Sequence, residues 1–324
     1  MAEFARSRAL GSIWGVCVGD ALGGPVQFSE PNTFTPITTL RFVQPFHKPA
    51  GSYSDDGSMT LALAQSLIDS QGTYDHALSI EYFLDWLCNG RFSTTSAAWD
   101  VGFSTRAALH SWKSLGVADI NQTQAHIDRA LDRENRSGNG SLMRIAPVGV
   151  VLWQDAATAK MVARQHGRVT HPSLPCVEAC DLYTELVCGA MRGDGKDQLC
   201  DMVRRFQPRH SKLAERMTRY KTLEGWRTRS ESEMRSSGWV VDTLEVALWA
   251  FFKYDSWAEG ALAVVNLGGD SDTAGAVFGG LAGAFYGYEA IPKEWVDGMQ
   301  NQELIGAVAG KLADLVISQS EKMI

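Results

Sequence analysis

The sequence lacks several features that mark particular classes of protein. It has six cysteines but no Cys-x-x-Cys pair, and Cys176 and Cys180 lie one helical turn apart in an apolar stretch. This pattern favours buried free thiols over zinc ligands and suits a reducing compartment. No apolar run reaches the length of a membrane span, and Arg6 and Arg8 lead directly into a glycine-rich motif with an internal acid, Asp20, rather than into a signal-peptide pattern. We therefore expect a cytoplasmic protein, or a nuclear one, without a membrane partner.

A net positive charge is also missing. The formal charge of −7 over 324 residues argues against non-specific nucleic-acid binding, which usually requires a basic face. The segment 204–235 departs from this balance because it is rich in Arg and Lys. It can be a solvated charged surface, or the rim of a site that attracts a phosphate-bearing or acidic substrate. Its arginines include Arg204, Arg205, Arg209, Arg216, Arg219, Arg227 and Arg229.

Strictly alternating β-strand patterns are scarce, and the apolar spacing is mostly helical. Met59, Leu63 and Leu67, for example, fall on one helical face. The chain is 45% hydrophobic with 10 Trp, so it can bury a sizeable core. No low-complexity linker or composition shift divides it. The sequence therefore predicts an all-α fold in a single domain over residues 1–324.

Glycine recurs at every fourth position in two of the expected helices. Each such glycine costs about 1 kcal/mol relative to alanine in a helix, but a glycine face lets another backbone approach closely. We expect both helices to pack tightly near the centre of the domain, and pairing with each other would bring the two ends of the chain together. Close packing without catalytic meaning is the alternative. The two series are Gly11, Gly15, Gly19 and Gly23, and Gly275, Gly279, Gly283 and Gly287.

Two acidic clusters, Ser54-Asp55-Asp56 and Asp270-Ser271-Asp272-Thr273, each open a helical stretch. Their ligands would all be oxygens, which Mg²⁺, Mn²⁺ or Ca²⁺ prefer, whereas zinc and copper favour nitrogen or sulfur. Buried carboxylates crowded together repel one another unless a cation neutralises them. Ordinary helix capping is the alternative, particularly for the first cluster. The sequence predicts a two-metal site, which requires Asp56 and Asp272 to lie within about 10 Å of each other.

Seven short motifs occur in an order that resembles the ADP-ribosylglycohydrolase family, the group of dinitrogenase-reductase-activating glycohydrolases and ADP-ribosylhydrolases. Any one of them is weak evidence, but the ordered set is specific and spans most of the chain. The resemblance implies a single compact, orthogonal helical bundle with a central di-metal cleft that holds two Mg²⁺ or Mn²⁺ ions. The motifs are G-D-A-L-G-G at 19–24, S-D-D-G-S-M at 54–59, W-D-V-G at 99–102, G-N-G-S-L-M-R at 138–144, T-H-P at 170–172, S-G-W-V-V-D-T-L at 237–244 and G-G-D-S-D-T-A-G at 268–275.

The resemblance also implies roles for individual residues. Asp100 would act beside the scissile bond, although it could instead cap the helix that starts near Phe103. His171 would contact ribose and Trp239 would stack on adenine, although a structural loop histidine and a core tryptophan are the alternatives. The implied metal ligands are Ser54, Asp55, Asp56, Asp270, Asp272 and Thr273. The implied catalytic residues are Asp100, Asp56 and Asp272, and the implied substrate-binding residues are Gln27, Gly138, Asn139, Gly140, Ser141, His171, Ser237, Gly238 and Trp239.

The sequence departs from the family pattern at four positions, one of which is Trp239, where relatives often have Tyr. Ser54 stands where relatives often have Thr, and it keeps the hydroxyl oxygen. Gly57 replaces another frequent Thr, which would remove a contact around the metal ligands. Gln27 replaces a Glu that has a catalytic or gating role in part of the family, and an amide cannot serve as a general base. Asp100 or a water activated by metal would then carry the proton chemistry.

The resemblance implies a metal-dependent hydrolase that cleaves the C1″ bond between ADP-ribose and an acceptor, most simply a protein side chain with an N- or O-glycosidic link. One alternative is hydrolysis of a small conjugate such as ADP-ribose 1″-phosphate. Another is a non-catalytic ADP-ribose binder or crystallin-like member, which Gln27 favours and the intact acidic clusters oppose. The expected partner is an ADP-ribose-bearing substrate, with nucleic acid only as an ADP-ribosylated end. The sequence gives no oligomeric state, and we expect a monomer.

Overall fold

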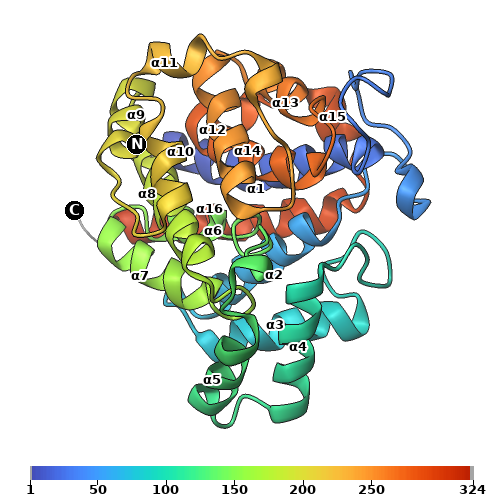
Figure 1. The fold of residues 1–324 in the computed structure, drawn as a ribbon. Coiled ribbons are helices and arrows are strands. Elements are labelled where there is room, and N and C mark those ends of the chain that lie inside the picture. Colours follow the sequence, from blue (N-terminus) through green and yellow to red (C-terminus); the bar gives the residue numbers. More distant parts are fainter. Residues whose placement is uncertain (1, 322–324) are drawn as a thin grey trace.

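The computed structural model describes residues 2–321, and these residues form sixteen α-helices, five short 3₁₀ helices and no strand. The all-α prediction is therefore confirmed. Figure 1 shows the helices, with α3, α4 and α5 gathered at the bottom of the view. The α-helices are α1 (Ala2–Gly23), α2 (Asp55–Asp69), α3 (His76–Asn89), α4 (Phe103–Leu115), α5 (Ile120–Leu131), α6 (Ala146–Val151), α7 (Ala156–Gly167), α8 (Leu174–Arg192), α9 (Lys196–Arg205), α10 (Ser211–Thr218), α11 (Leu223–Arg227), α12 (Val240–Lys253), α13 (Trp257–Val265), α14 (Ser271–Tyr286), α15 (Lys293–Asp297) and α16 (Gln302–Glu321).

The two glycine-rich helices, α1 and α14, pack directly against each other in the middle of the molecule (Figure 1). Their contacts run in opposite directions along the chain, with Gly15 facing Gly279 and Gly19 facing Gly275. A Cβ atom added to Gly15 would lie 2.1 Å from the carbonyl oxygen of Gly279, so neither helix can carry a larger residue there without moving. The prediction of close packing is confirmed, and the partner of each helix is the other.

Helix α1 is surrounded by protein over most of its length. Every residue from Gly11 to Gly23 is buried, which explains why the helix is apolar on all faces. By length and composition alone, the stretch Ala2–Val26 could cross a membrane, and 89% of its most apolar window lies inside the protein. The expectation that no apolar run reaches spanning length was therefore wrong for this stretch. Its burial is typical of a central helix in a globular core.

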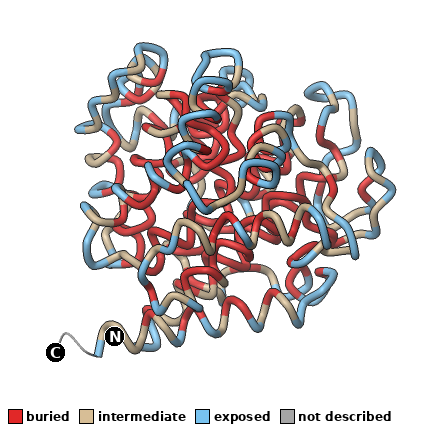
Figure 2. The backbone as a smooth tube through the Cα atoms, turned by 90° about the horizontal axis from the view of Figure 1, so that it is seen from below, coloured by how far each residue is buried: buried red, intermediate tan, exposed pale blue. Residues whose placement is uncertain are grey.

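The buried side chains form one continuous hydrophobic cluster that draws on helices from α1 to α16. Figure 2 shows the buried residues running through the interior and the exposed ones at the periphery. Cys176 and Cys180 belong to this cluster as free thiols, as the sequence predicted. The single domain over 1–324 stays a prediction, and a continuous core is what it requires.

The arginine-rich segment folds as the end of α9, then α10 and α11, and its charges are balanced within the protein. Arg216, for instance, pairs with Glu245, and Arg209 pairs with Glu178 at 3.3 Å. This supports the interpretation as a charged surface over that of a phosphate-attracting rim. All seven arginines named above make such pairs, namely Arg204, Arg205, Arg209, Arg216, Arg219, Arg227 and Arg229.

Candidate active site

Three helix ends meet at a buried cluster of carboxylates. Asp20 lies near the end of α1, Asp56 in the first turn of α2 and Asp272 in the first turn of α14. All three are 1–2% exposed, and one carboxylate oxygen from each lies within 4.8 Å of the other two. Asp56 and Asp272 thus lie as close together as the predicted two-metal site requires. The approach follows from the glycine pairing, because α1 and α14 carry two of the three acids.

The electrostatics of this cluster are unfavourable unless protons or a cation are present. Burial raises the pKa of Asp55, Asp56 and Asp272 well above the usual range, and neighbouring carboxylates raise it further. The Oδ1 atoms of Asp20, Asp56 and Asp272 are buried and have no hydrogen-bond partner within residues 2–321. Unpartnered buried carboxylate oxygens are costly. An oxygen-only set of this kind fits a hard divalent cation such as Mg²⁺ or Mn²⁺.

Asp20 is the one member of the cluster that the sequence did not predict as part of the site. Its Oδ2 accepts hydrogen bonds from the backbone N–H groups of Ser54 at 2.8 Å and Gly57 at 2.9 Å, so it holds the start of α2 against α1. Burial raises the pKa of Asp20 to about 7, against the lowering effect of these two N–H groups. The available signal was a lone charged residue within a buried, glycine-rich helix. A single residue has no spacing pattern, so the sequence could not predict a ligand role for it.

The second acidic cluster is tied to the glycine loop at 138–141. Asp270 is the N-cap of α14 but makes no side-chain capping bond. Its Oδ2 instead accepts a hydrogen bond of 2.5 Å from Asn139 Nδ2, and its Oδ1 accepts one of 3.4 Å from the Thr273 hydroxyl. Capping therefore does not account for Asp270. In the first cluster, Ser54 does cap α2, and its hydroxyl also donates to Asp56 at 3.0 Å.

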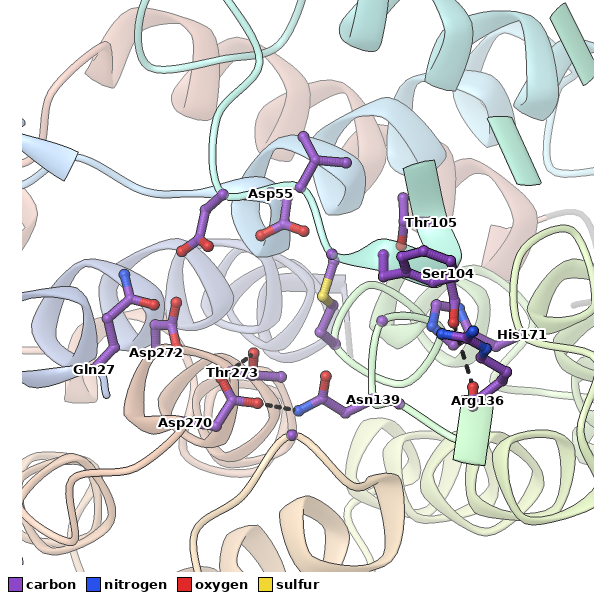
Figure 3. A pocket seen from close by; sticks show the side chains of 18 of the residues that line it. Gln27, Asp55, Ser104, Thr105, Arg136, Asn139, His171, Asp270, Asp272 and Thr273 are labelled. Atoms are coloured by element: carbon purple, nitrogen blue, oxygen red, sulfur yellow. Dashed lines mark hydrogen bonds between the residues drawn. The ribbon is translucent and has the colours of Figure 1, made fainter. Parts of the chain in front are cut away.

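A cleft of about 380 Å³ opens beside the carboxylates. Figure 3 shows Asp55, Asp270 and Asp272 on one side of it, with Gln27 near them and His171 and Arg136 toward the other end. The cleft brings together eleven of the residues that the sequence singled out for the site. They are Gln27, Asp55, Asp100, Gly138, Asn139, Gly140, His171, Gly238, Asp270, Asp272 and Thr273.

Five predicted site residues lie outside the cleft lining. Ser54 and Asp56 are buried behind it, next to Asp20. Ser141 is fully buried and accepts a hydrogen bond from the Cys180 thiol. Ser237 donates to Asp242 at 2.7 Å. Trp239 is half-buried at the start of α12, where its backbone pairs with that of Gly138, so stacking of its ring on adenine stays a prediction.

Asp100 lies in the cleft and does not cap helix α4. The N-cap of α4 is Gly102, so the capping alternative for Asp100 was wrong. Its backbone has a φ of 57°, a left-handed conformation that is uncommon outside glycine and often found at functional sites. Burial raises the pKa of Asp100 to about 6, while the adjacent Gln27 and Asp272 side chains partly offset the rise. A carboxyl with this pKa can exchange protons near neutral pH.

These raised pKa values predict how bound metal should change stability with pH. The folded protein favours the protonated form of the Asp20 carboxyl group. Its contribution to the free energy of unfolding is fully present below the pKa of 3.8 in the unfolded chain, and it is lost as the pH rises through the folded-state pKa of about 7. Metal-free protein should therefore lose melting temperature between pH 5 and pH 8, and Mg²⁺ or Mn²⁺ should restore it by taking the place of the protons. At a hundredfold excess over the dissociation constant, we expect a gain of about 4 °C for each bound ion at pH 8.

Thermal melts in chelator and in divalent salt, at matched ionic strength, measure this gain. At pH 5 it should be much smaller, because the carboxyl groups are protonated and bind metal poorly. A gain that is equal at both pH values, or absent at pH 8, would contradict the metal assignment.

Three comparisons with known proteins identify similar sequences and a similar structure. A family model described as ADP-ribosylglycohydrolase matches residues 1–322. ADP-ribosylarginine hydrolase Tri1 of Pseudomonas putida strain GB-1 is 32% identical over 313 residues, which cover 96% of this chain and 79% of that protein. The ADP-ribosyl-(dinitrogen reductase) glycohydrolase of Rhodospirillum rubrum is 28% identical over 295 residues, or 90% of each chain. A solved structure described as an ADP-ribosylglycohydrolase-related protein complex superposes with a TM-score of 0.79 at 31% identity, and covers 97% of this chain and 99% of its own.

Proposed function

The chain belongs to the ADP-ribosylglycohydrolase family, and from that premise we propose that it hydrolyses the C1″ bond between ADP-ribose and a protein arginine in a metal-dependent reaction. One observation carries the proposal. Carboxylates from three separate helices converge within 4.8 Å beside a cleft that also contains the Gly138–Gly140 loop and His171. A purely structural protein has no need for such a buried concentration of negative charge.

The carboxylate oxygens of Asp55, Asp56, Asp270 and Asp272, with the Ser54 and Thr273 hydroxyls, would hold the divalent ions. The ions, when bound, supply Lewis-acid chemistry that orients ribose hydroxyls and activates water. Asn139 fixes the Asp270 carboxylate through its amide. Asn139 itself is held by its second bond, at 2.8 Å, to Thr243. The chain thus preorganises this part of the site before any ligand arrives.

Asp100 would carry the proton transfers. Its pKa of about 6 leaves both protonation states accessible near neutral pH. Gln27 lies beside it and can only donate or accept a hydrogen bond, so it would orient Asp100 or the substrate without taking a proton. As positive charge develops on the ribose, the carboxylate cluster would stabilise it.

The charge of the site favours a cationic acceptor. Six carboxyl groups surround the cleft or lie directly behind it, namely Asp20, Asp55, Asp56, Asp100, Asp270 and Asp272. If all are ionised, two divalent cations offset four of the six negative charges, and Arg136 at the other end of the cleft offsets a fifth. The remaining negative potential favours a guanidinium over a phosphate next to the scissile bond. Two of the named relatives that this chain resembles are ADP-ribosylarginine hydrolases.

A panel of linkage types tests the acceptor. Purified protein with Mg²⁺ and, separately, Mn²⁺ is given arginine-linked, serine-linked and phosphate-linked ADP-ribose, and the release of ADP-ribose is measured. We expect the arginine linkage to be cleaved fastest, by about tenfold or more, since one uncompensated charge contact is worth about 1.5–3 kcal/mol. Faster cleavage of ADP-ribose 1″-phosphate would favour the small-conjugate alternative.

The non-catalytic alternative rests on Gln27, which replaces the Glu found in much of the family. The same panel separates it from the proposal. Calorimetry that shows ADP-ribose binding, together with no release from any of the three linkages, would identify the protein as a binder.

A further inference from the structure

Arg144 is a fully buried guanidinium at the end of the glycine loop, and the function proposed above gives it no task. It is 0% exposed and makes no ion pair with a carboxylate in the part of the chain that the structure describes. The Phe83 ring lies beside it, with its centroid 4.7 Å from the guanidinium carbon. Burying a cation without a directly paired anion is costly. Its role in the fold is therefore indicated by its hydrogen bonds.

Those hydrogen bonds join three segments around the cleft. Nη1 donates to the carbonyl oxygen of Gly140 at 2.8 Å, and Nε donates to Nε2 of His166 at 3.1 Å. Nη2 donates to the Thr170 hydroxyl at 2.9 Å. The rigid guanidinium fork thus fixes the glycine loop, the end of α7 and the turn at 170–172 relative to one another.

The bond to Thr170 decides which ring nitrogen of His171 carries a proton. Thr170 Oγ1 lies 2.8 Å from Nδ1 of His171. Because arginine can only donate, the Thr170 hydroxyl accepts from Arg144 and has one hydrogen left to give. Within residues 2–321, Nδ1 of His171 is the only acceptor in reach of that hydrogen. If Nδ1 were protonated instead, the buried hydroxyl hydrogen would have no partner, which is costly.

The other nitrogen of the ring, Nε2, faces the cleft. His171 lines the cleft beside Gly140, toward the end opposite Gln27 (Figure 3). A Cβ atom on Gly140 would lie 2.6 Å from Cε1 of His171, so glycine is what lets the ring occupy this place. Burial, with the charge of Arg144, lowers the pKa of His171 to about 3, and the ring is neutral at neutral pH.

We propose that Arg144 and Thr170 are positioning residues that hold His171 as the neutral Nε2–H tautomer, so that Nε2 donates a hydrogen bond to a ribose or phosphate oxygen of the bound nucleotide. The identity of the ligand rests on the function proposed above. The tautomer does not, because the chain sets it before a ligand binds.

Nitrogen NMR of the full chain with ¹⁵N-labelled histidine tests the tautomer directly. The His171 signals are assigned by their loss in His171→Gln, and the shifts of the two ring nitrogens show which is protonated. We expect Nε2 to carry the proton and Nδ1 to be free of it at neutral pH. Protonation of Nδ1 in the unmodified protein would overturn the inference without recourse to any variant.

Two variants of one residue test the path through Thr170. Thr170→Val keeps the shape but removes the hydroxyl, so His171 should lose its preference for Nε2–H, and the Kd for ADP-ribose should rise about tenfold. Thr170→Ser keeps the hydroxyl and should restore both. A merely structural role for Thr170 would lower the melting temperature and leave the tautomer unchanged. An unchanged tautomer and an unchanged Kd in Thr170→Val would refute the inference.

The NMR and binding measurements together separate this inference from the proposed function. If the unmodified protein shows the Nε2–H tautomer but binds no ADP-ribose, the positioning by Arg144 and Thr170 stands and the substrate class is refuted.

Discussion

Asp272→Asn should abolish release of ADP-ribose, with a loss on the order of a thousandfold or more in kcat/KM. Asp272 lies at the centre of the carboxylate cluster, 2% exposed, with an Oδ1 that has no hydrogen-bond partner among the described residues. The amide has the same size but no charge, so the change removes a metal ligand without leaving a cavity. The measurement is steady-state turnover of arginine-linked ADP-ribose in saturating Mg²⁺.

The same variant should not destabilise the metal-free protein. In chelator, Asp272→Asn removes one of several buried, mutually repelling carboxylates, so the metal-free variant should melt no lower than the metal-free parent. The rise in melting temperature on adding Mg²⁺ should largely disappear. Asp297→Asn is the matched control, because Asp297 is an exposed carboxylate on α15 that pairs with Lys293; it should change neither property. A variant of Asp272 that keeps both its activity and its response to metal would contradict the site.

Gly279→Ala should prevent normal folding or cost about 3 kcal/mol, at the upper end of the range for overpacked cores. The new Cβ would lie 2.0 Å from the carbonyl oxygen of Gly15, and this neighbour is the backbone of a buried helix that cannot rotate away. Helices α1 and α14 must then separate, and with them Asp20 and Asp272. Soluble yield and the urea midpoint measure stability, and binding of Mn²⁺ by any folded fraction measures the damage to the site.

Gly310→Ala provides the control for this prediction. Gly310 lies in α16, and a Cβ atom there would meet nothing within 4 Å. Alanine is about 1 kcal/mol better than glycine in a helix, so this variant should be as stable as the parent or slightly more so. Equal tolerance of alanine at positions 279 and 310 would show that the close packing of α1 and α14 is not required.

Most of what could be predicted from the sequence was predicted from the glycine spacing and the acidic clusters. Glycine at every fourth position has few explanations in a helix other than close backbone contact, so the pairing of α1 with α14 could be anticipated. That pairing in turn places Asp272 near the end of α1. The oxygen-only chemistry of the two clusters pointed to hard cations for a reason that does not depend on the detailed fold.

Other parts of the site depend on tertiary contacts that leave no local pattern. Asp20 and Arg144 both lie inside recognised motifs, yet nothing in their spacing shows that one holds the start of α2 and the other fixes the turn before His171. The sequence offered Asp100 as an N-cap of α4, and only the folded backbone shows that Gly102 takes that position. Some arginines of 204–235 pair with carboxylates three or four residues away, such as Arg204 with Asp201. Others, such as Arg209 and Arg216, pair with carboxylates on α8 and α12, which the sequence alone could not place beside them.

The most direct test of the metal assignment is anomalous diffraction from crystals grown with Mn²⁺ and ADP-ribose. We expect anomalous peaks between the carboxylates of Asp56 and Asp272, at oxygen distances typical of a hard divalent cation, with the ribose at the carboxylate end of the cleft. Crystals that bind ADP-ribose there but show no anomalous peak among these carboxylates would contradict it.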